Sequence, residues 1–303
     1  YIFLLCEIYI FMKKYHKLEE LLKDYRDYTC ISQSELASQL DVDVRTVIRW
    51  EKGESLLNPE KEKALAFITF IPYQVIRNLN TPVQIPTFFD FDLRKYSLSS
   101  ILSELPDADW IKSRIDITTS RIRTIDSKNK IAPVIRFTEL QKNPLKSKNT
   151  ELIWEACKLL PELNLIIYDQ SQNYSGHCVF FPLSLATYNK IINREIEEYQ
   201  IQPQDLVNYK TQDCPVFYCH SITADCNENF FYIIGTVLKF YKNTPLKKYL
   251  YALLTSRYDS HNISDQLGVK TIWEDVDIKN KFKLLDAPRL VEGTFDKFLD
   301  IKN

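Results

Sequence analysis

The sequence predicts a multidomain chain, with an all-α region of five helices at residues 12–79 and an α/β (α+β) region at residues 151–303. Three observations predict this division. Apolar residues recur at helical spacing up to residue 79, two prolines interrupt the pattern in the stretch 80–89, and short apolar runs alternate with helical stretches after residue 150. We therefore expect two domains, separated by a connector and accessory segment at residues 80–150.

The first two predicted helices lie at the start of the all-α region. One covers residues 17–28, where leucines and a tyrosine fall on one side at helical spacing. The other begins at Gln33, because Ser32 and Glu35 have the spacing of a capping box. This second helix should end near Leu40, since turn-forming residues follow it directly.

The third predicted helix runs from Val44 to Lys52. Asp43 supplies its N-cap, and Gly53 is the glycine expected just beyond its C-terminus. Helical spacing places Val47 and Trp50 on the inner side, against the preceding helix. The outer surface then carries Arg45, Thr46, Ile48 and Arg49.

The composition of that outer surface suits DNA. Two guanidinium groups lie on either side of a hydroxyl, near a helix N-terminus. They can donate hydrogen bonds to phosphate oxygens and to the edges of guanine bases. Ile48 would contact a thymine methyl group or pack on another domain. The pattern therefore predicts a DNA-reading helix-turn-helix, and the alternative is an amphipathic helical hairpin without a DNA role.

The same stretch resembles the XRE (lambda-repressor/Cro-like) helix-turn-helix family. The matching residues are Ser32, Gln33, Leu36, Ala37, Thr46, Val47, Arg49, Trp50, Glu51 and Gly53. The resemblance implies that Gln33 holds a phosphate, and that the residues facing the major groove are Val44, Arg45, Thr46 and Arg49. With the neighbouring outer residues, the predicted DNA-binding set is Gln33, Val44, Arg45, Thr46, Ile48, Arg49 and Lys52. The family usually has glycine at Asp41, so we expect slight strain in this turn.

Two further helices complete the all-α region. Asn58-Pro59 supplies an N-cap and a proline at the first helical position, opening a helix through Phe67. Pro72 begins another short helix, which ends near Asn78. Five helices in about seventy residues is the size that the family resemblance implies.

Overall charge and composition exclude some classes of protein. The formal net charge is −1, and 26% of the residues are charged, so this is no polycation that binds DNA by charge alone. We expect double-stranded DNA as the partner, and a homodimer would supply a second half-site. The small-molecule effector cannot be identified from the sequence. A cytoplasmic, bacterial, nucleoid-associated location fits these expectations.

The cysteines and the beginning of the chain also bear on location. Seven scattered cysteines without a secretory pattern favour reduced thiols. Buried thiols are the preferred interpretation of Cys214, Cys219, His220 and Cys226, and a zinc site is the alternative.

Residues 1–11 precede the only methionine, Met12, and we interpret them as upstream sequence. A membrane anchor is the competing interpretation, but the run is too short and Glu7 interrupts it, so no membrane partner is expected.

The accessory segment is mixed in character. Residues 80–89 are interpreted as the connector, and a short helix is expected over 99–105. Arg121 and Arg123 would extend a basic surface towards DNA, although a solvated strand or helix face is the commoner explanation. Residues 142–148 are predicted to be a polar loop.

Helices and strands alternate in the α/β region. Predicted helices cover residues 152–160, 186–196, 230–240 and 262–267, and predicted strands cover 163–168, 177–182, 215–221, 249–254 and 270–273. The first two strands should form a hairpin, and the last is predicted to be the final strand. A hairpin followed by β-α-β-α-β indicates a sheet with helices packed on it.

The order of these elements resembles the GNAT acyltransferase fold over at most positions 150–275. The elements that carry the resemblance are 215–221, 230–240, 249–254 and Gln266-Leu267-Gly268-Val269. The family holds the coenzyme A pyrophosphate on the backbone amides of a loop with the pattern [Arg/Gln]-x-x-Gly-x-[Gly/Ala]. If Gly235 is the glycine of that loop, Tyr232 and Val237 replace its other positions. We therefore expect no catalytic residues, no metal and no cofactor, with acetyl-coenzyme A as the alternative that the resemblance raises.

Three functions follow from these observations. The first is a sequence-specific transcriptional regulator with a C-terminal ligand-binding, dimerising or partner-binding domain. The second is a DNA-targeted GNAT-type N-acyltransferase, which the altered loop disfavours. The third is an autoregulatory toxin-antitoxin or phage-type component.

Overall fold

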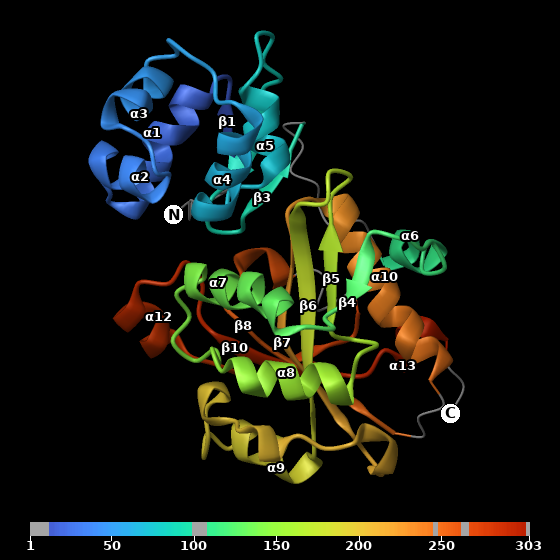
Figure 1. The fold of residues 1–303 in the computed structure, drawn as a ribbon. Coiled ribbons are helices and arrows are strands. Elements are labelled where there is room, and N and C mark those ends of the chain that lie inside the picture. The colour runs from blue at the N-terminus through green and yellow to red at the C-terminus, as the bar shows by residue number, and fades with distance from the viewer. Residues whose placement is uncertain (1–11, 99–107, 245–247, 262–266, 301–303) are drawn as a thin grey trace, which may run out of the picture. The chain divides into compact units, whose positions relative to one another are not determined.

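The computed structural model describes residues 12–98, 108–244, 248–261 and 267–300 (Figure 1). The chain divides into two compact units, Tyr1–Glu104 and Leu105–Asn303. Both units combine helices with a β-sheet, so the architecture is α+β and in two parts. No helix in the described residues is long and apolar enough to cross a membrane.

The first unit contains the five helices that the sequence predicts. They are α1 (Leu18–Thr29), α2 (Gln33–Gln39), α3 (Val44–Glu51), α4 (Pro59–Thr69) and α5 (Tyr73–Leu79). The predicted caps are confirmed: Ser32 and Glu35 form a complete capping box at α2, and Asn58 accepts a hydrogen bond from the Lys61 amide at α4. The apolar sides of these helices meet in one core, in which Leu21, Leu65 and Val75 are fully buried.

The first unit also contains a small sheet, so the all-α prediction for this region is wrong. The strands β1 (Lys13–Tyr15), β2 (Thr87–Asp90) and β3 (Lys95–Ser97) form an antiparallel sheet in the order β1-β2-β3. Pro82 and Pro86 both precede the first residue of β2, so neither removes a donor from the ladder. Phe89, which seemed to belong to the connector, is buried in the helical core.

The segment 80–150, predicted as a connector and accessory segment, contributes strands to both units. Its strand β2 pairs with the N-terminal strand β1 and with β3, and the strand β4 (Ile122–Thr124) pairs with β5 (Leu165–Tyr168) in the second unit. The division of this segment between the two units depends on strands that pair with residues far away in the sequence. Local composition does not reveal such pairs. The helix predicted over 99–105 lies outside the described residues.

The second unit is built on one sheet. Beyond β4 and β5, its strands are β6 (Tyr174–Leu183), β7 (Val216–Ala224), β8 (Leu250–Thr255), β9 (Lys270–Glu274) and β10 (Arg289–Gly293). The order is β4-β5-β6-β7-β8-β10-β9, and all neighbours are antiparallel except β7 and β8. The predicted hairpin of β5 and β6 is confirmed. The prediction that the strand near residue 270 is the last one is wrong, because β10 follows it and pairs between β8 and β9.

Helices cover both faces of this sheet (Figure 1). The helices of the unit are α6 (Ala108–Ser113), α7 (Ala132–Leu140), α8 (Thr150–Leu159), α9 (Leu185–Ile192), α10 (Asn227–Asn243), α12 (Val276–Phe282) and α13 (Asp296–Leu299). Alternate residues of the central strands enter opposite cores: Phe180 packs with α10, whereas Phe181 packs with α8 and α9. The helix predicted over 262–267 falls almost entirely outside the described residues.

Candidate nucleic-acid interface

Helix α3 is anchored by its inner side. Val47 is fully buried and Trp50 is only 5% exposed, as the helical spacing predicts. The carboxylate of Asp43 accepts a hydrogen bond of 2.8 Å from the Arg45 amide and so caps the helix N-terminus. Gly53 has a φ of +70°, the left-handed conformation expected of the glycine beyond a helix end. The orientation of α3 is therefore set by two buried side chains and two terminal residues.

The outer side of α3 is positively charged and open. Arg45, Arg49 and Lys52 are exposed, Val44 is 37% exposed, and Thr46 and Ile48 are half-buried. Within the described part of the chain, the guanidinium groups of Arg45 and Arg49 have no hydrogen-bond or ion-pair partner. The acidic residue of the helix, Glu51, is buried on the other side and bonded to Arg26. The guanidinium N–H groups of two arginines on one exposed helix face can therefore donate to an acceptor outside the protein.

The turn between α2 and α3 contains a residue in the left-handed conformation. Asp41 has a φ of +51°, which L-residues other than asparagine and aspartate seldom adopt. The ammonium of Lys61, at the start of α4, donates to the Leu40 carbonyl at 2.9 Å. This contact connects α4 to the turn that positions α3.

Gln33 lies at the first position of α2 and is half-buried. Its side-chain amide donates to Glu51 Oε2 at 2.8 Å, so the structure connects it to α3 from within the unit. The amide nitrogen has a second hydrogen that this bond does not use, and a phosphate contact would use that hydrogen. Gln33 is thus both a structural partner of α3 and a candidate contact at the helix N-terminus.

The network around Glu51 is the part of this site that sequence reasoning missed. The guanidinium of Arg26, on α1, donates to both Glu51 oxygens, at 2.5 Å from Nε and 2.9 Å from Nη2. This bond raises the pKa of Arg26 above its ordinary value. Because Glu51 also accepts from Gln33, one carboxylate joins α1, α2 and α3. The match of Glu51 to the family pattern was the only signal available for it.

A second polar cluster is buried in the other unit. Glu198 is fully buried, and its Oε1 accepts from His220 Nδ1 at 2.7 Å and from the Ser147 amide at 3.0 Å. Its Oε2 accepts from Lys146 Nζ and from the Tyr218 hydroxyl, both at 3.0 Å. The predicted polar loop over 142–148 is confirmed, and this pairing allows Lys146 and Ser147 within it to be buried.

Protonation in this cluster follows from burial and pairing. Burial, the largest effect, raises the pKa of Glu198, but the Lys146 ammonium and the hydrogen bonds from His220 and Ser147 outweigh it and lower that pKa below its ordinary value. Burial lowers the pKa of His220 more than Glu198 raises it. We therefore assign an ionised carboxylate and a neutral imidazole at neutral pH.

The residues considered as metal ligands are Cys214, Cys219, His220 and Cys226. No group of three or more histidine, cysteine, aspartate or glutamate side chains with metal-binding geometry occurs in the described ranges. Cys219 is buried, and burial raises its pKa and that of Cys226 to about 12. These thiols are therefore protonated at neutral pH.

The strand-loop-helix unit after β7 lacks the chemistry of a pyrophosphate loop. Gly235 lies in the middle of α10, so it cannot be the glycine of a loop between β7 and α10. The residues at that junction include Asp225, which is buried, and Glu228, which lies in the first turn of α10. Two carboxylates near a helix N-terminus compete with an incoming phosphate for the same donors.

Arg121 and Arg123 are engaged within the second unit. Arg121 forms an ion pair with Glu228, with Nη2 and Oε1 3.0 Å apart, and Arg123 donates to the Gln172 side chain at 2.7 Å. The interpretation of this pair as a strand face is confirmed, since both residues flank or belong to β4.

Comparisons with known proteins add no family. No protein-family model matches the chain, and no curated protein matches it at a significant level. The functional conclusion therefore depends on the geometry of the residues described above.

Proposed function

We propose that this protein is a sequence-specific DNA-binding transcriptional regulator of the helix-turn-helix type, in which α3 enters the major groove. The observation that carries the proposal is the pair Arg45 and Arg49, exposed on one helix face without internal partners while Val47 and Trp50 anchor the opposite face. A bidentate guanidinium can read the O6 and N7 atoms of guanine, and Thr46 and Ile48 lie between the two arginines to contact phosphate or a thymine methyl group.

The charge distribution supports specific over non-specific binding. The whole chain has a formal charge of −1, so it lacks the strong positive field of a non-specific DNA-binding protein. Helix α3 has eight residues and reaches only a few base pairs, so a useful specificity requires a second half-site. We propose a homodimer on DNA, with half-sites spaced by about one helical turn.

We infer that the second unit is a GNAT-like domain that has a sensing or partner-binding role. The parallel neighbours β7 and β8, connected through α10, support the fold assignment. Two features argue against acetyl-coenzyme A: the carboxylates of Asp225 and Glu228 at the start of α10, and the position of Gly235 inside that helix. Calorimetric titration of the full chain with acetyl-coenzyme A should give no saturable heat, and micromolar binding would favour the acyltransferase alternative instead.

Selection from random duplex DNA tests the regulator proposal. The full chain is incubated with a library of random duplexes, and the bound fraction is recovered and sequenced over several rounds. We expect enrichment of one short motif, repeated about one helical turn apart. The double variant Arg45→Ala/Arg49→Ala should enrich nothing above the starting library. Failure of the wild type to enrich any motif, or the same enrichment by the double variant, would reject the proposal.

A further inference from the structure

Strand β9 lies at an edge of the seven-stranded sheet. Within the described residues it pairs with β10 on one side and with no strand on the other. Helix α12 begins two residues after β9 ends, and none of its residues is buried. From this edge we infer that two copies of the chain associate through β9 and α12, in antiparallel contact about a two-fold axis at Ile272. This deepens the proposed homodimer and rests on that proposal for the choice of a second copy as the partner.

The charges of β9 are complementary to those of a second copy. The strand reads Lys270-Thr271-Ile272-Trp273-Glu274, so antiparallel contact centred on Ile272 places Lys270 of one copy opposite Glu274 of the other. The two-fold axis gives this pair twice, because contacts are reciprocal in an isologous interface. Opposite charges directly across an antiparallel pair stabilise it.

Both charged side chains are accessible to a second copy. The Lys270 side chain is 72% exposed, and its Nζ lies 3.5 Å from Glu292 Oε1 of its own chain. An ammonium has three hydrogens, so Lys270 can donate to a second carboxylate as well. Glu274 is exposed at the other end of the strand.

The middle of the edge is apolar. A lysine and a bulge usually hinder pairing at a sheet edge, and β9 has both. Ile272 is the extra residue of the bulge, since its neighbours Thr271 and Trp273 pair with successive residues of β10. The side chains of Ile272 and Trp273 are consequently both half-buried against the same core. Burial of their exposed parts by a second copy would add hydrophobic stabilisation at the axis.

Helix α12 adds apolar surface beside this edge. Val276 is 54% exposed and Phe282 43%, and Leu285, three residues after the helix, is 50% exposed. Figure 1 shows α12 on the side of the second unit opposite to α6. Strand β9 alone is about 17 Å long, whereas specific interfaces bury about 800 Å² per partner. The apolar side chains of α12 therefore have to contribute to a stable dimer.

The other edge of the sheet, β4, repels a copy of itself. Antiparallel contact centred on Ile122 places Arg121 opposite Arg123, and contact centred on Arg123 places that residue opposite its own copy. Like charges directly opposite each other destabilise such a pair. Association through β9 therefore ends with two copies, because β4 forms both outer edges of the joined sheets.

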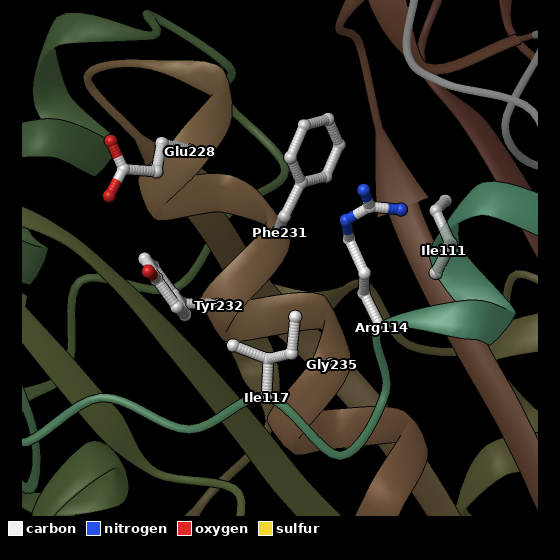
Figure 2. Close-up of a pocket in the computed structure, with 7 residues that line it drawn as sticks. All are labelled: Ile111, Arg114, Ile117, Glu228, Phe231, Tyr232 and Gly235. Carbon is white, nitrogen blue, oxygen red and sulfur yellow. The ribbon is translucent and has the colours of Figure 1, made fainter.

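The surface between α6 and α10 is a weaker candidate for this contact. It is hollowed by a pocket of about 200 Å³ (Figure 2), lined by Ile111, Arg114, Ile117, Glu228, Phe231, Tyr232 and Gly235. Its charged residues have partners in their own chain, since Arg114 donates to Ser113 Oγ at 3.2 Å and Glu228 pairs with Arg121. Two copies of one hollow do not fill each other, so contact here would leave a void.

Sedimentation equilibrium of the full chain without DNA tests the inference. The chain has a mass of 35.8 kDa, and we expect twice that mass at micromolar concentration. Lys270→Glu places like charges opposite each other and should raise the dimer Kd about tenfold or more, and Glu274→Lys should do the same. Lys158→Glu is the matched control, because Lys158 also pairs with one carboxylate of its own chain, that of Glu155. This control should keep the Kd within about twofold of the wild type.

Mixing the two reversal variants gives the sharpest test. Each variant alone should be monomeric where the wild type is a dimer, and an equimolar mixture should form a heterodimer, because every charge pair across the axis is then opposite again. Recovery in the mixture also shows that both variants are folded.

The inference is overturned by a monomeric wild type, which includes the case that the first unit of the same chain covers β9. It is also overturned by a dimer that neither variant weakens, or by a mixture that stays monomeric. Because no DNA is present, these outcomes are independent of whether α3 reads DNA. A dimer of this kind without motif enrichment would reject the regulator proposal alone.

Discussion

At the scale of single residues, Asp41 is the residue that departs most clearly from the helix-turn-helix pattern that the sequence resembles. It adopts a φ of +51° in the turn before α3, where the resemblance implies glycine. The left-handed conformation costs about 1 kcal/mol for residues with a Cβ atom, and less for aspartate than for most. The sequence alone predicted this strain, because the turn length and the following N-cap are local features.

Asp41→Gly should therefore stabilise the first unit by up to about 1 kcal/mol, by relieving that conformation. Chemical denaturation of wild type and variant measures the change. Asp41→Ala is the matched control, since it removes the same carboxylate and keeps the Cβ atom, and it should give no gain. Equal stabilisation by both variants would mean that charge, and not backbone strain, is responsible.

The buried cluster at Glu198 gives a pH dependence. The pKa of His220 is below its ordinary value in the folded state, so the unfolded state takes up the proton first. Stability should therefore fall as the pH drops below about 6.5, by up to about 1.4 kcal/mol between pH 7.5 and 5.5. The lowered pKa of Glu198 adds a further loss as the pH falls below about 4.5 and through its folded-state pKa.

Thermal unfolding at several pH values measures this effect, and His220→Gln isolates it. The variant should lose the decline between pH 7.5 and 5.5 that His220 causes, while the decline at lower pH that Glu198 causes is measured separately. A variant whose pH profile is parallel to that of the wild type would show that His220 protonates equally in both states. The sequence contained no sign of this cluster, because its partners are separated by as much as 74 positions along the chain.

At the scale of elements, the helices of the first unit were predictable and its strands were not. Capping residues such as Ser32 and Asn58 lie within a few positions of the backbone groups that they bond. The local sequence therefore predicts where these helices begin. Strand β2 is short and pairs with β1 and β3, and only the pairing makes it a strand. The missed strand β10 has the same explanation, since its place between β8 and β9 is set by distant partners.

Trp50 anchors α3, so Trp50→Ala should unfold the first unit or destabilise it by about 3–5 kcal/mol. The loss of a buried aromatic side chain from the core is the cause. Circular dichroism during thermal or chemical unfolding measures the change. Arg45→Ala, on the exposed side of the same helix, should stay within about 0.5 kcal/mol of the wild type. A normal unfolding curve for Trp50→Ala would mean that α3 is oriented differently.

The carboxylate of Glu51 joins three helices, so its removal should affect all of them. Glu51→Ala leaves the guanidinium of Arg26 without its bidentate partner, and Arg26 is only 18% exposed. We expect a loss of about 3 kcal/mol. The double variant Arg26→Ala/Glu51→Ala tests the reason, because it removes the uncompensated charge and should be less unstable than the sum of the single changes. Strict additivity would show that the two side chains act independently.

At the scale of the whole molecule, the sequence predicted a chain in two parts that contains helices and strands, and it left residues 80–150 between the two parts. Composition and periodicity separated residues 12–79 from the region after 150. The structure divides the chain between Glu104 and Leu105, because strands formed by residues 87–97 belong with the N-terminal helices. The candidate DNA-binding residues were predictable from local helix geometry, whereas the buried cluster at Glu198 depends on partners that lie far apart in the sequence.

The central claim is that Arg45 and Arg49 read DNA, and an equilibrium binding titration with the selected duplex tests it most directly. Arg45→Ala and Arg49→Ala should each weaken binding by about 1–3 kcal/mol, or about 5- to 150-fold, with unfolding curves like that of the wild type. Arg123→Ala, which removes the same charge from the second unit, should bind within about twofold of the wild type. Wild-type affinity in both folded α3 variants would contradict the account.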